Sequence, residues 1–501
     1  MTHLHYDVII IGSGAGGGTV ASRLAALAAD GLKIAVLEAG PHFSKEYFTQ
    51  REIEMFDLFE SGGAFPSSDG AITASFGKAM GGSTIMYSGV TFRLPDSVCE
   101  QWSVEGLSSS DLKSRFEKLE KELHVIEPGK EMENDNNRLF KEGCEKIGIS
   151  VKKILLNIKN CEQMGFCNLG CAHGNKQGTL SVQLPAASSA GVELIPNCKV
   201  TDLFEKRVRA TICKAPPGSL PGALNEGIYE FHAKIIVLAG GTVGSSALLL
   251  KSDFKKDFPV LGSYITLHPA MTVYGIYPKK IKNYKGFPKI YYSSDYSNTP
   301  GYYLETAFYY PFITAKNLSL WGKDLKYAMN RYNNLMAIII LVHDDALADN
   351  KITLNRKNEP VLDYTLSDKS ISAFCDAQAK ASKIFFAAGC NEVVMPAAEK
   401  PLFSKGDLNG REPESFITPK TFIPNKMPVA TAHLQGGCRM GRDRNDSVTD
   451  CWGKVHGKDW LYIADGSLFP QSSHVNPYLT IMTLADRVSE RLIATKDQWM
   501  A

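Results

Sequence analysis

Four residues near the N-terminus have the types and the spacing needed to hold a dinucleotide. Gly12, Gly14 and Gly17 follow an apolar run, and Glu38 ends a second apolar run about 20 residues later. Glycine permits a tight turn at Gly12, a close approach of backbone to a pyrophosphate at Gly14, and close helix packing at Gly17. The Glu38 carboxylate can accept hydrogen bonds from an adenosine ribose. Glycines alone would indicate a plain turn before a core helix, whereas the four residues in register predict a dinucleotide site.

Three cysteines lie close together at Cys161, Cys167 and Cys171, interleaved with glycines. Thiolates at this spacing can converge on one soft metal centre, either a three-iron cluster or a four-iron cluster completed by another group such as His173. Zinc with His173 as the fourth ligand is a further alternative. The cysteines could instead be buried packing residues or form one chance disulfide, so the spacing leaves the metal site open.

The C-terminal part of the chain supplies a candidate for acid–base chemistry. A histidine such as His433 can take a proton from a hydroxyl group, although a lone histidine is more often structural. A short strand over 461–464 ends in Asp465 and Gly466, and Pro477 fits the first turn of the closing helix. A strand that ends in an acid close to a helix N-terminus can hold the ribityl chain and an electron-rich carbonyl of a flavin.

A parallel sheet is needed to position these residues. A buried strand, a glycine turn, the Ala- and Leu-rich helix over 19–29 and a second strand form a βαβ unit. Another buried strand runs through Gly240 into a helix that ends near Leu250, so the nucleotide fold should be assembled from separated pieces of chain. The expected strands of this sheet are 8–11, 33–37, 192–196, 199–204 and 233–239.

Three further segments have a distinct character. Glycines are dense over 76–95, where backbone N–H groups could contact a flavin ring, although a plain loop would show the same pattern. Residues 107–124 predict an amphipathic helix. From Leu261 to about Phe422, aromatic residues and apolar strands predominate. This stretch predicts a second, largely antiparallel domain whose sheet could form one wall of a substrate cavity.

The composition is typical of a soluble globular protein. The chain has 501 residues, of which 44% are hydrophobic and 22% are charged, and its length favours two domains. The net charge of +2 gives no reason to expect nucleic acid or an anionic membrane as a partner. No apolar run approaches the roughly 20 residues of a membrane span.

Compartment can be inferred from the N-terminus and the cysteines. Only a few residues precede the first expected strand, which leaves no room for a signal peptide. The 11 cysteines are odd in number and mostly scattered, unlike a secreted disulfide framework. We therefore expect a cytoplasmic protein that reaches a membrane or the exterior only through a partner.

Taken together, these segments resemble the glucose-methanol-choline (GMC) oxidoreductases, flavoproteins that oxidise alcohols. The most specific matches are 12–38, 77–95, 239–250, 433–441 and 465–482. The resemblance implies an α/β fold with a Rossmann-like FAD-binding domain and a largely antiparallel substrate domain. We predict that the FAD-binding domain comprises 5–95, 180–262 and 430–501. The substrate domain would comprise 96–179 and 263–429, including the cysteine-rich segment 161–179.

The resemblance also implies roles for the residues that match the family motifs. The ADP half of FAD would be held by Gly12, Gly14, Gly17 and Glu38, the adenine would meet Val200, and the isoalloxazine would face the backbone of Gly81, Gly82, Ser83 and Thr84. Asp465 would lie near the ribityl and pyrophosphate groups, and the other cofactor contacts would be Gly240, Gly466, Asn476 and Pro477. Because no histidine lies between Gly77 and Pro95, FAD is expected to be non-covalent.

For catalysis, the resemblance implies a pair formed by His433 and Asn476. The imidazole would take the hydroxyl proton while a hydride goes to flavin N5, and the amide would hydrogen-bond the same oxygen. His474 is a further, lower-ranked candidate. The main alternative is a family relative that keeps the flavin as a scaffold for lyase chemistry. An NAD-linked Rossmann enzyme is the other alternative, and the C-terminal motif argues against it.

Within the family, two subgroups are similar to different parts of the chain. Cys161, Cys167 and Cys171 resemble the cysteine segment of FAD-dependent sugar dehydrogenase subunits, whose thiols bind a three-iron cluster. Residues 170–179 and 267–269 look closer to long-chain alcohol oxidases. A cluster would imply electron transfer to a partner protein or quinone, and a small accessory subunit. The substrate, an alcohol or a sugar, stays open.

Overall fold

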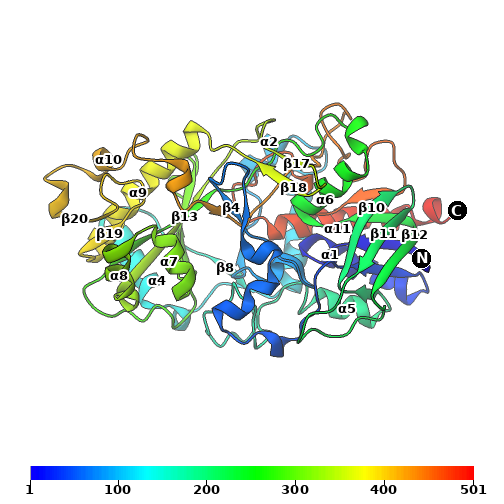
Figure 1. Ribbon diagram of the computed structural model, residues 1–501, viewed down its shortest axis with the longest axis horizontal. Coiled ribbons are helices and arrows are strands. Elements are labelled where there is room, and N and C mark those ends of the chain that lie inside the picture. Colours follow the sequence, from blue (N-terminus) through cyan, green and yellow to red (C-terminus); the bar gives the residue numbers. More distant parts are fainter. Residues whose placement is uncertain (1) are drawn as a thin grey trace.

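The first sheet is assembled from strands that are far apart in the sequence. In the computed structural model, which describes residues 2–501, it contains seven strands: β1 (Thr2–Ile11), β2 (Ile34–Leu37), β9 (Glu193–Ile195), β10 (Cys198–Phe204), β11 (Arg207–Ile212), β12 (Gly227–Leu238) and β22 (Leu461–Ile463). β1 lies between β2 and β12, and β9 and β22 extend the parallel pairing, whereas β10 and β11 are antiparallel. Both chain termini lie beside this sheet (Figure 1). The expected strands and their assembly from separated segments are confirmed.

Helices bury the apolar strands of this sheet. α1 (Ala15–Ala29) packs against α5 (Gln183–Ser189) and α11 (Tyr478–Ala494), and α6 (Gly241–Lys251) packs against β10. α2 (Asp96–Trp102) and α3 (Ser109–Glu122) join the same core, because the apolar stripe of α3 contacts α11. Residues 96–122 therefore lie with the nucleotide sheet and not, as the sequence suggested, with the substrate domain.

The second sheet is antiparallel apart from the pairing of β4 with β21. Its strands in the described chain are β3 (Phe65–Pro66), β4 (Thr73–Ala74), β7 (Lys152–Lys153), β13 (Ala270–Ile276), β14 (Tyr291–Ser293), β15 (Tyr302–Thr306), β16 (Leu335–Val342), β19 (Glu392–Val394), β20 (Leu402–Ser404) and β21 (Ala430–Thr431). Three of these strands, β3, β4 and β21, come from the segments 5–95 and 430–501, which the sequence assigned to the FAD-binding domain.

Successive side chains along each strand of the second sheet point to opposite faces, so the two faces have different contacts. Ile338 and Ile340 of β16 face the core formed with α4 (Asp135–Lys146) and α9 (Asp368–Ala388). On the other face, Leu335 and Ala337 lie under α7 (Pro311–Leu318) and α8 (Gly322–Met329). Leu341 continues that second face beyond those helices, where it is left to line a pocket. The expected cavity wall is thus a stretch of sheet that no helix of the described chain covers.

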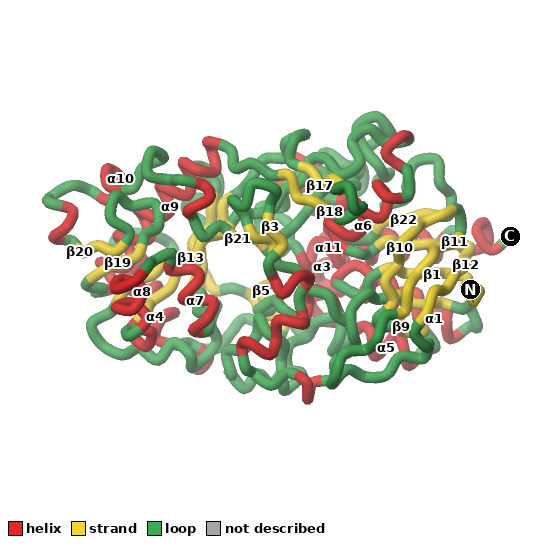
Figure 2. The backbone as a smooth tube through the Cα atoms, in the orientation of Figure 1, coloured by secondary structure: helices red, strands yellow, loops and turns green. Residues whose placement is uncertain are grey.

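Between the two sheets Figure 2 shows mostly loops, and the remaining elements of the chain are short. They are β5 (Val90–Thr91), β6 (Val125–Ile126), β8 (Leu155–Asn157), β17 (Lys351–Leu354), β18 (Pro360–Asp363), α10 (Pro413–Phe416), α12 (Lys496–Met500) and ten 3₁₀ helices, among them η4 (Gly82–Ile85) and η10 (Gly466–Leu468). Within residues 2–501, no helix combines the length and the apolar character needed to traverse a bilayer.

Candidate functional site

The first strand–helix turn has the geometry of an anion site. Gly12 has a φ of 102°, and a Cβ atom there would lie 2.3 Å from the carbonyl oxygen of Ala239. At Gly17, a Cβ atom would lie 1.9 Å from the oxygen of Gly12, so α1 can approach the strand only without a side chain. α1 starts at the N-cap Gly14 and has no side-chain cap and no acid in its first turn. Its first N–H groups are therefore available to a phosphate.

Glu38 lies buried at the end of β2, directly beside this turn. Its Oε2 accepts hydrogen bonds from the backbone N–H and the hydroxyl of Ser13, and its Oε1 accepts from the N–H of Gly40. Burial raises the pKa of this carboxyl, and the hydrogen bonds from Ser13 and Gly40 oppose that shift. β10 begins beside Glu38, because the N–H of Cys198 donates to the Glu38 carbonyl at 2.8 Å. Val200, the expected adenine contact, follows two residues later in β10.

The glycine segment folds against the same turn. The N–H of Gly81 donates to Ser13 Oγ at 2.9 Å, and a Cβ on Gly14 would lie 3.8 Å from the Cα of Gly82. Two short bonds close the segment on itself, from Gly77 N to Ser83 Oγ at 2.9 Å and from Thr84 Oγ1 to Gly81 O at 2.7 Å. A side chain is excluded at Gly82, where a Cβ would lie 2.6 Å from the Cα of Gly14, and this leaves backbone to face a flat ligand.

Asp465 joins the end of β22 to the start of α6. Its Oδ2 accepts hydrogen bonds from Gly241 N at 2.9 Å and from Ser245 Oγ at 2.5 Å, and its Oδ1 accepts from Ser467 N at 2.8 Å. Gly240, just before α6, donates its own N–H to Ser245 Oγ. Burial raises the pKa of Asp465. The carboxylate therefore holds two segments together at the edge where a cofactor would pass.

The N-terminus of α11 is also open. Pro477 is its N-cap residue, one position before the first turn in which the sequence placed it, and no side chain caps the helix. The hydroxyl of Thr480 in the first turn is buried without a hydrogen-bond partner. Gly466 lies nearby, where a Cβ would be 3.0 Å from Leu434 O. Uncapped N–H groups and an unpartnered hydroxyl fit the electron-rich carbonyl of a flavin, so these residues and the α1 turn suit FAD.

His433 and Asn476 lie together, as the resemblance implied. The Nε2 atom of His433 is 3.5 Å from Nδ2 of Asn476. Their two loops are fixed by Gln435, which is fully buried, accepts from Ser473 N at 2.8 Å and donates to His433 O at 3.1 Å. A hydroxyl oxygen placed between the imidazole and the amide could contact both groups.

His268 is a site residue that the sequence interpretation missed. Its Nδ1 atom lies 3.4 Å from Nδ1 of His433, and the two rings meet at 90°. Its Nε2 atom is buried and has no hydrogen-bond partner within residues 2–501. The only sequence signal for it was the segment 267–269, which resembled a subgroup of the family but suggested no role.

His474 does not contact His433. Its ring stacks on His343, with centroids 4.3 Å apart and planes 7° apart, and its backbone has a φ of 57°. Burial lowers the pKa of His474, and the cation of Lys369 lowers it further. His474 thus forms part of the pocket wall, and no contact in the described chain supports a direct role in proton transfer.

The pocket beside this pair is lined by side chains from β15 and β16 of the second sheet, from the loops before β13 and after β5, and from the C-terminal loop. They are Phe92, His268, Tyr303, Glu305, Leu341, His474, Val475 and Asn476. Glu305 is 1% exposed and pairs with Lys289 at 3.1 Å, a buried ion pair that no sequence pattern indicated. Most of the lining is apolar or aromatic, with the ion pair and the imidazoles supplying the polar contacts.

The histidines of the pocket are held in the neutral form. Burial lowers the pKa of His433 to about 3, and the nearby Lys289 cation acts in the same direction. Burial likewise lowers the pKa of His343 to about 3 and that of His268 well below its ordinary value, with the neighbouring imidazoles adding to both shifts. A neutral imidazole can accept a proton, so His433 is ready to act as a base at neutral pH.

Asp344 connects the segments behind these histidines. It accepts hydrogen bonds from the backbone N–H groups of Leu267 and His268, at 2.6 and 3.2 Å, and from the hydroxyls of Tyr364 and Ser472, at 2.8 and 3.2 Å. Burial raises its pKa to about 6 despite these bonds. Asp344 therefore fixes the His268 loop against the C-terminal loop that carries Asn476.

The three cysteines lie near one another but do not surround a single ion. Over residues 2–501, the one group of three ligand atoms within 4.8 Å of one another lies elsewhere, and His173 pairs with Glu162 at 3.0 Å. The buried ammonium of Lys176 donates to the carbonyl of Cys167 at 2.6 Å. Burial raises the pKa of Cys167 to about 12, and Lys176 opposes that shift. A zinc site completed by His173 is thus not formed.

Comparison with known proteins gives the family. Two GMC oxidoreductase models match residues 55–270 and 346–485, together more than half of the chain. The long-chain-alcohol oxidase FAO1 of Arabidopsis thaliana is 28% identical, covering 97% of this chain and 66% of that protein. FAO4A of the same plant is 26% identical, covering 96% and 67%. The chain spans about two thirds of the length of these relatives.

Solved structures show the same fold. Pyridoxine 4-oxidase of Mesorbium loti has a TM-score of 0.70 at 15% identity, covering 98% of this chain and 99% of that one. A formate oxidase variant of Aspergillus oryzae has a TM-score of 0.72 at 14% identity, covering 99% of each chain. The flavin-scaffold lyase and the NAD-linked enzyme that the sequence left open receive no support from these proteins. The chain belongs to the GMC oxidoreductase family of FAD-dependent enzymes.

Proposed function

We propose that this chain oxidises the CH–OH group of a small-molecule alcohol to an aldehyde or ketone, using non-covalently bound FAD. The observation that carries the proposal is the neutral imidazole of His433 beside the amide of Asn476, at a pocket of a GMC oxidoreductase. When bound, FAD supplies the hydride acceptor.

In this proposal side chains of the protein accept the hydroxyl proton of the substrate. His433 accepts the hydroxyl proton at Nε2, the atom that faces Asn476, and the Asn476 amide donates to the same oxygen. For Nε2 to be free of a proton, Nδ1 must carry one, and it can donate that proton to Nδ1 of His268. His268 then carries its own proton on Nε2, the atom that has no partner in the protein. His268 is therefore a positioning residue that selects the tautomer of the base.

The pocket favours an alcohol with an apolar body. Phe92, Tyr303, Leu341 and Val475 form an apolar and aromatic part of its lining, beside the polar groups of Glu305, Asn476 and the two imidazoles. The relatives named long-chain-alcohol oxidases support the same substrate class. We therefore place primary alcohols with a hydrocarbon chain ahead of sugars.

Anaerobic mixing of the FAD-loaded protein with a panel of aliphatic alcohols and sugars tests the proposal. Alcohol should bleach the oxidised flavin, and His433→Ala should slow this by about 10³-fold while FAD stays bound. His474→Gln is the matched control, because His474 stacks in the pocket wall without contacting His433, and it should change the rate far less. Full-rate bleaching by His433→Ala would show that the base is another group, and no bleaching with any alcohol would exclude alcohol oxidation.

The acceptor and the mode of flavin attachment need separate measurements. Reoxidation by oxygen, a quinone or a cytochrome distinguishes an oxidase from a dehydrogenase. Acid precipitation should release all flavin into the supernatant if FAD is non-covalent. A cytoplasmic location stays a prediction, which cell fractionation would check.

An iron–sulfur cluster at Cys161, Cys167 and Cys171 is a separate proposal, and the spacing of the thiols is its only support. The cation of Lys176 beside these thiols is compatible with an anionic centre. Iron analysis and low-temperature electron paramagnetic resonance of anaerobically purified protein would decide it. Iron would imply a partner protein or quinone as electron acceptor, and a small accessory subunit. Well-folded protein without iron would leave the three cysteines as packing residues.

A further inference from the structure

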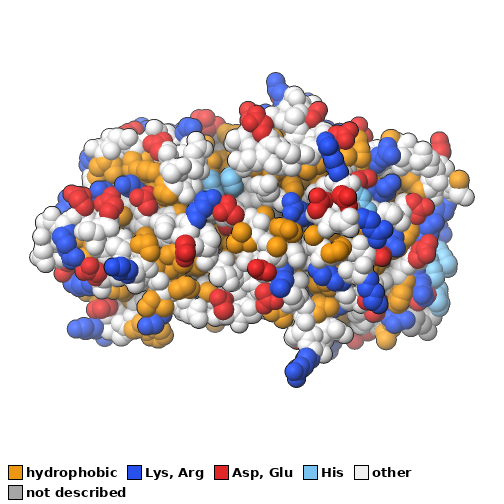
Figure 3. Space-filling view, turned by 90° about the horizontal axis from the view of Figure 1, so that it is seen from above, with side chains coloured by type: hydrophobic (Ala, Val, Ile, Leu, Met, Phe, Trp, Pro, Cys, Tyr) orange, Lys and Arg blue, Asp and Glu red, His pale blue; other side chains and the backbone are white. Residues whose placement is uncertain are grey.

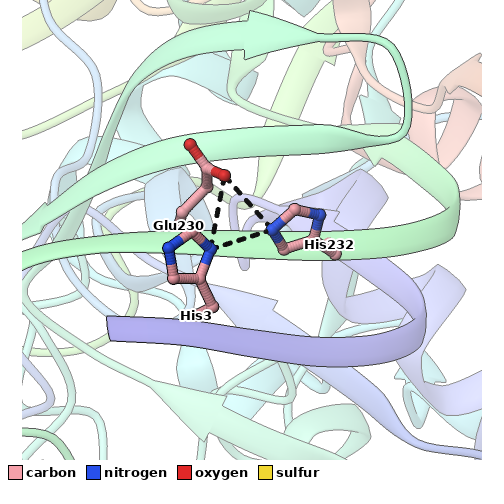
Figure 4. A group of neighbouring side chains, drawn as sticks. All are labelled: His3, Glu230 and His232. Carbon is pink, nitrogen blue, oxygen red and sulfur yellow. Dashed lines mark hydrogen bonds and ion pairs between the residues drawn. The ribbon is translucent and has the colours of Figure 1, made fainter. Parts of the chain in front are cut away.

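A second group of ligating side chains lies at the opposite end of β1 from Gly12. In the parallel pairing of β1 with β12, His3 stands opposite Glu230 and His5 opposite His232. Since alternate residues of a strand share a face, all four side chains project from the same side of the sheet. Figure 4 shows His3, Glu230 and His232 turned toward one another. Histidines also reach the surface at this end of the molecule in Figure 3.

The three ligating atoms are spaced as a metal ion requires. His3 Nδ1 lies 3.2 Å from His232 Nε2 and 3.4 Å from Glu230 Oε1, and His232 Nε2 lies 3.2 Å from Glu230 Oε1. A tetrahedral zinc ion with bonds of about 2.0–2.1 Å separates neighbouring ligand atoms by about 3.3 Å. The three atoms therefore match one face of such a tetrahedron, which leaves the fourth corner to water.

Neighbouring residues hold the ligands in place. The Glu230 side chain is 6% exposed, and its other oxygen, Oε2, accepts a hydrogen bond from Arg207 at 2.9 Å. Arg207 thus leaves only Oε1 for an ion. The His232 ring stacks on His5, with centroids 4.7 Å apart. His3, at 53% side-chain exposure, leaves the site accessible from solvent.

We propose that His3, Glu230 and His232 bind one divalent transition-metal ion, for which Zn²⁺ is the probe. Two imidazole nitrogens and one carboxylate oxygen are ligands that Zn²⁺ accepts readily. Nine residue steps of β1 separate His3 from Gly12, about 30 Å of strand, so the ion would take no part in the reaction at the pocket. It would instead fasten the start of the first strand to β12 and stabilise the sheet.

The test is Zn²⁺ binding to the FAD-loaded 501-residue chain by equilibrium dialysis, combined with thermal unfolding. His3→Gln and His232→Gln should each lose one equivalent of zinc and weaken that site by about a hundredfold or more. They should also lose the rise in Tm that zinc gives the wild type. His5→Gln is the matched control, since His5 lies on the same face and stacks on His232 but is not a ligand, and it should keep the site.

Comparison of variants separates this site from any zinc taken up by the cysteine thiols, because the thiols are the same in every variant. Retained FAD and an unchanged circular dichroism spectrum would show that the variants fold. Zinc titrations that coincide for the wild type and both ligand variants would overturn the proposal. An equal loss of zinc binding in His5→Gln would overturn it too, because binding would then depend on the number of histidines near the start of β1 and not on the three-atom geometry.

Discussion

Histidines gather at two places in this molecule, and their surroundings differ. Beside the pocket, His268, His343 and His433 lie close to one another in desolvated surroundings, and the cation of Lys289 acts on His433. At the start of β1, His3 and His232 lie near solvent with the carboxylate of Glu230 within 3.4 Å of both rings. The surroundings of the pocket histidines therefore disfavour added positive charge, whereas those at the start of β1 favour it.

The contrast shows that burial and the nearest charge decide what an imidazole can do. A neutral ring without a carboxylate partner can serve as a base for a hydroxyl group. A ring beside a carboxylate and open to water can serve as a ligand. Variants that change the surroundings of one group and not the other therefore test whether the two groups really differ in this way.

The largest effect is expected at Asp344. Asp344→Ala would leave the N–H groups of Leu267 and His268 and the hydroxyls of Tyr364 and Ser472 without their acceptor. Lost hydrogen bonds to buried donors should reduce the free energy of unfolding by about 3 kcal/mol or more, as measured by urea denaturation.

Asp345→Ala is the control for this variant. Asp345 is half exposed and pairs with Lys369 at the surface, so its removal should change stability by about 0.5 kcal/mol or less. Equal losses in the two variants would mean that Asp344 does not hold the pocket segments together.

The second effect concerns stability and pH. The folded pKa of His343 is about 3, below the value near 6.5 of an unfolded histidine, so acid favours the unfolded chain. The contribution of His343 should therefore lower the free energy of unfolding by up to about 1.4 kcal/mol per pH unit as the pH falls below 6.5. Asp344 acts in the opposite direction, because its folded pKa is raised to about 6.

His343→Gln separates these contributions. It removes one buried titrating ring, so the slope of unfolding free energy against pH between 6 and 4.5 should become shallower by about 1 kcal/mol per unit. A slope identical to that of the wild type would show that His343 is already charged in the folded protein.

The third effect concerns activity and pH. Because the pKa of His433 is about 3, the rate of flavin reduction should stay flat as the pH falls from 8 to 5. The paired change Lys289→Met with Glu305→Leu removes the nearby cation and its partner together. Burial is the larger cause of the low pKa of His433. The acid limb of the pH–rate profile should therefore move to higher pH by less than about one unit. A fall in the wild-type rate with an apparent pKa near 6.5 would contradict a desolvated base.

The fold was largely predictable because its decisive signals are local. The βαβ unit from β1 to β2 and the strand that runs into α6 each lie within one continuous stretch. Helix α3 was predicted correctly as a helix, but its partner was not, because an amphipathic stripe does not tell which core it faces. The start of β1 at Thr2, before the expected Val8, also depends on pairing with β12.

The site was predictable only where a family motif carries it. His433 and Asn476 were identified from the C-terminal motif, and the structure brings them together. His268, Asp344 and the pair of Lys289 with Glu305 lie around β13 to β16 and reach the pocket through strand register and burial. One sequence does not encode that register in any local pattern, so these residues could not be assigned roles.

The smallest effect is expected at His232, beside the start of β1, in the absence of metal. With zinc removed by a chelator, His232→Gln loses one imidazole contact and a partly exposed stacking interaction, so stability should change by about 0.5 kcal/mol or less. The same substitution made at His343 lies in a buried setting and should cost more at neutral pH, because it replaces a ring packed against His474. If the edge variant were the more destabilising of the two without metal, the imidazoles at β1 would be structural contacts in their own right, and the contrast between a buried base and an exposed ligand would fail.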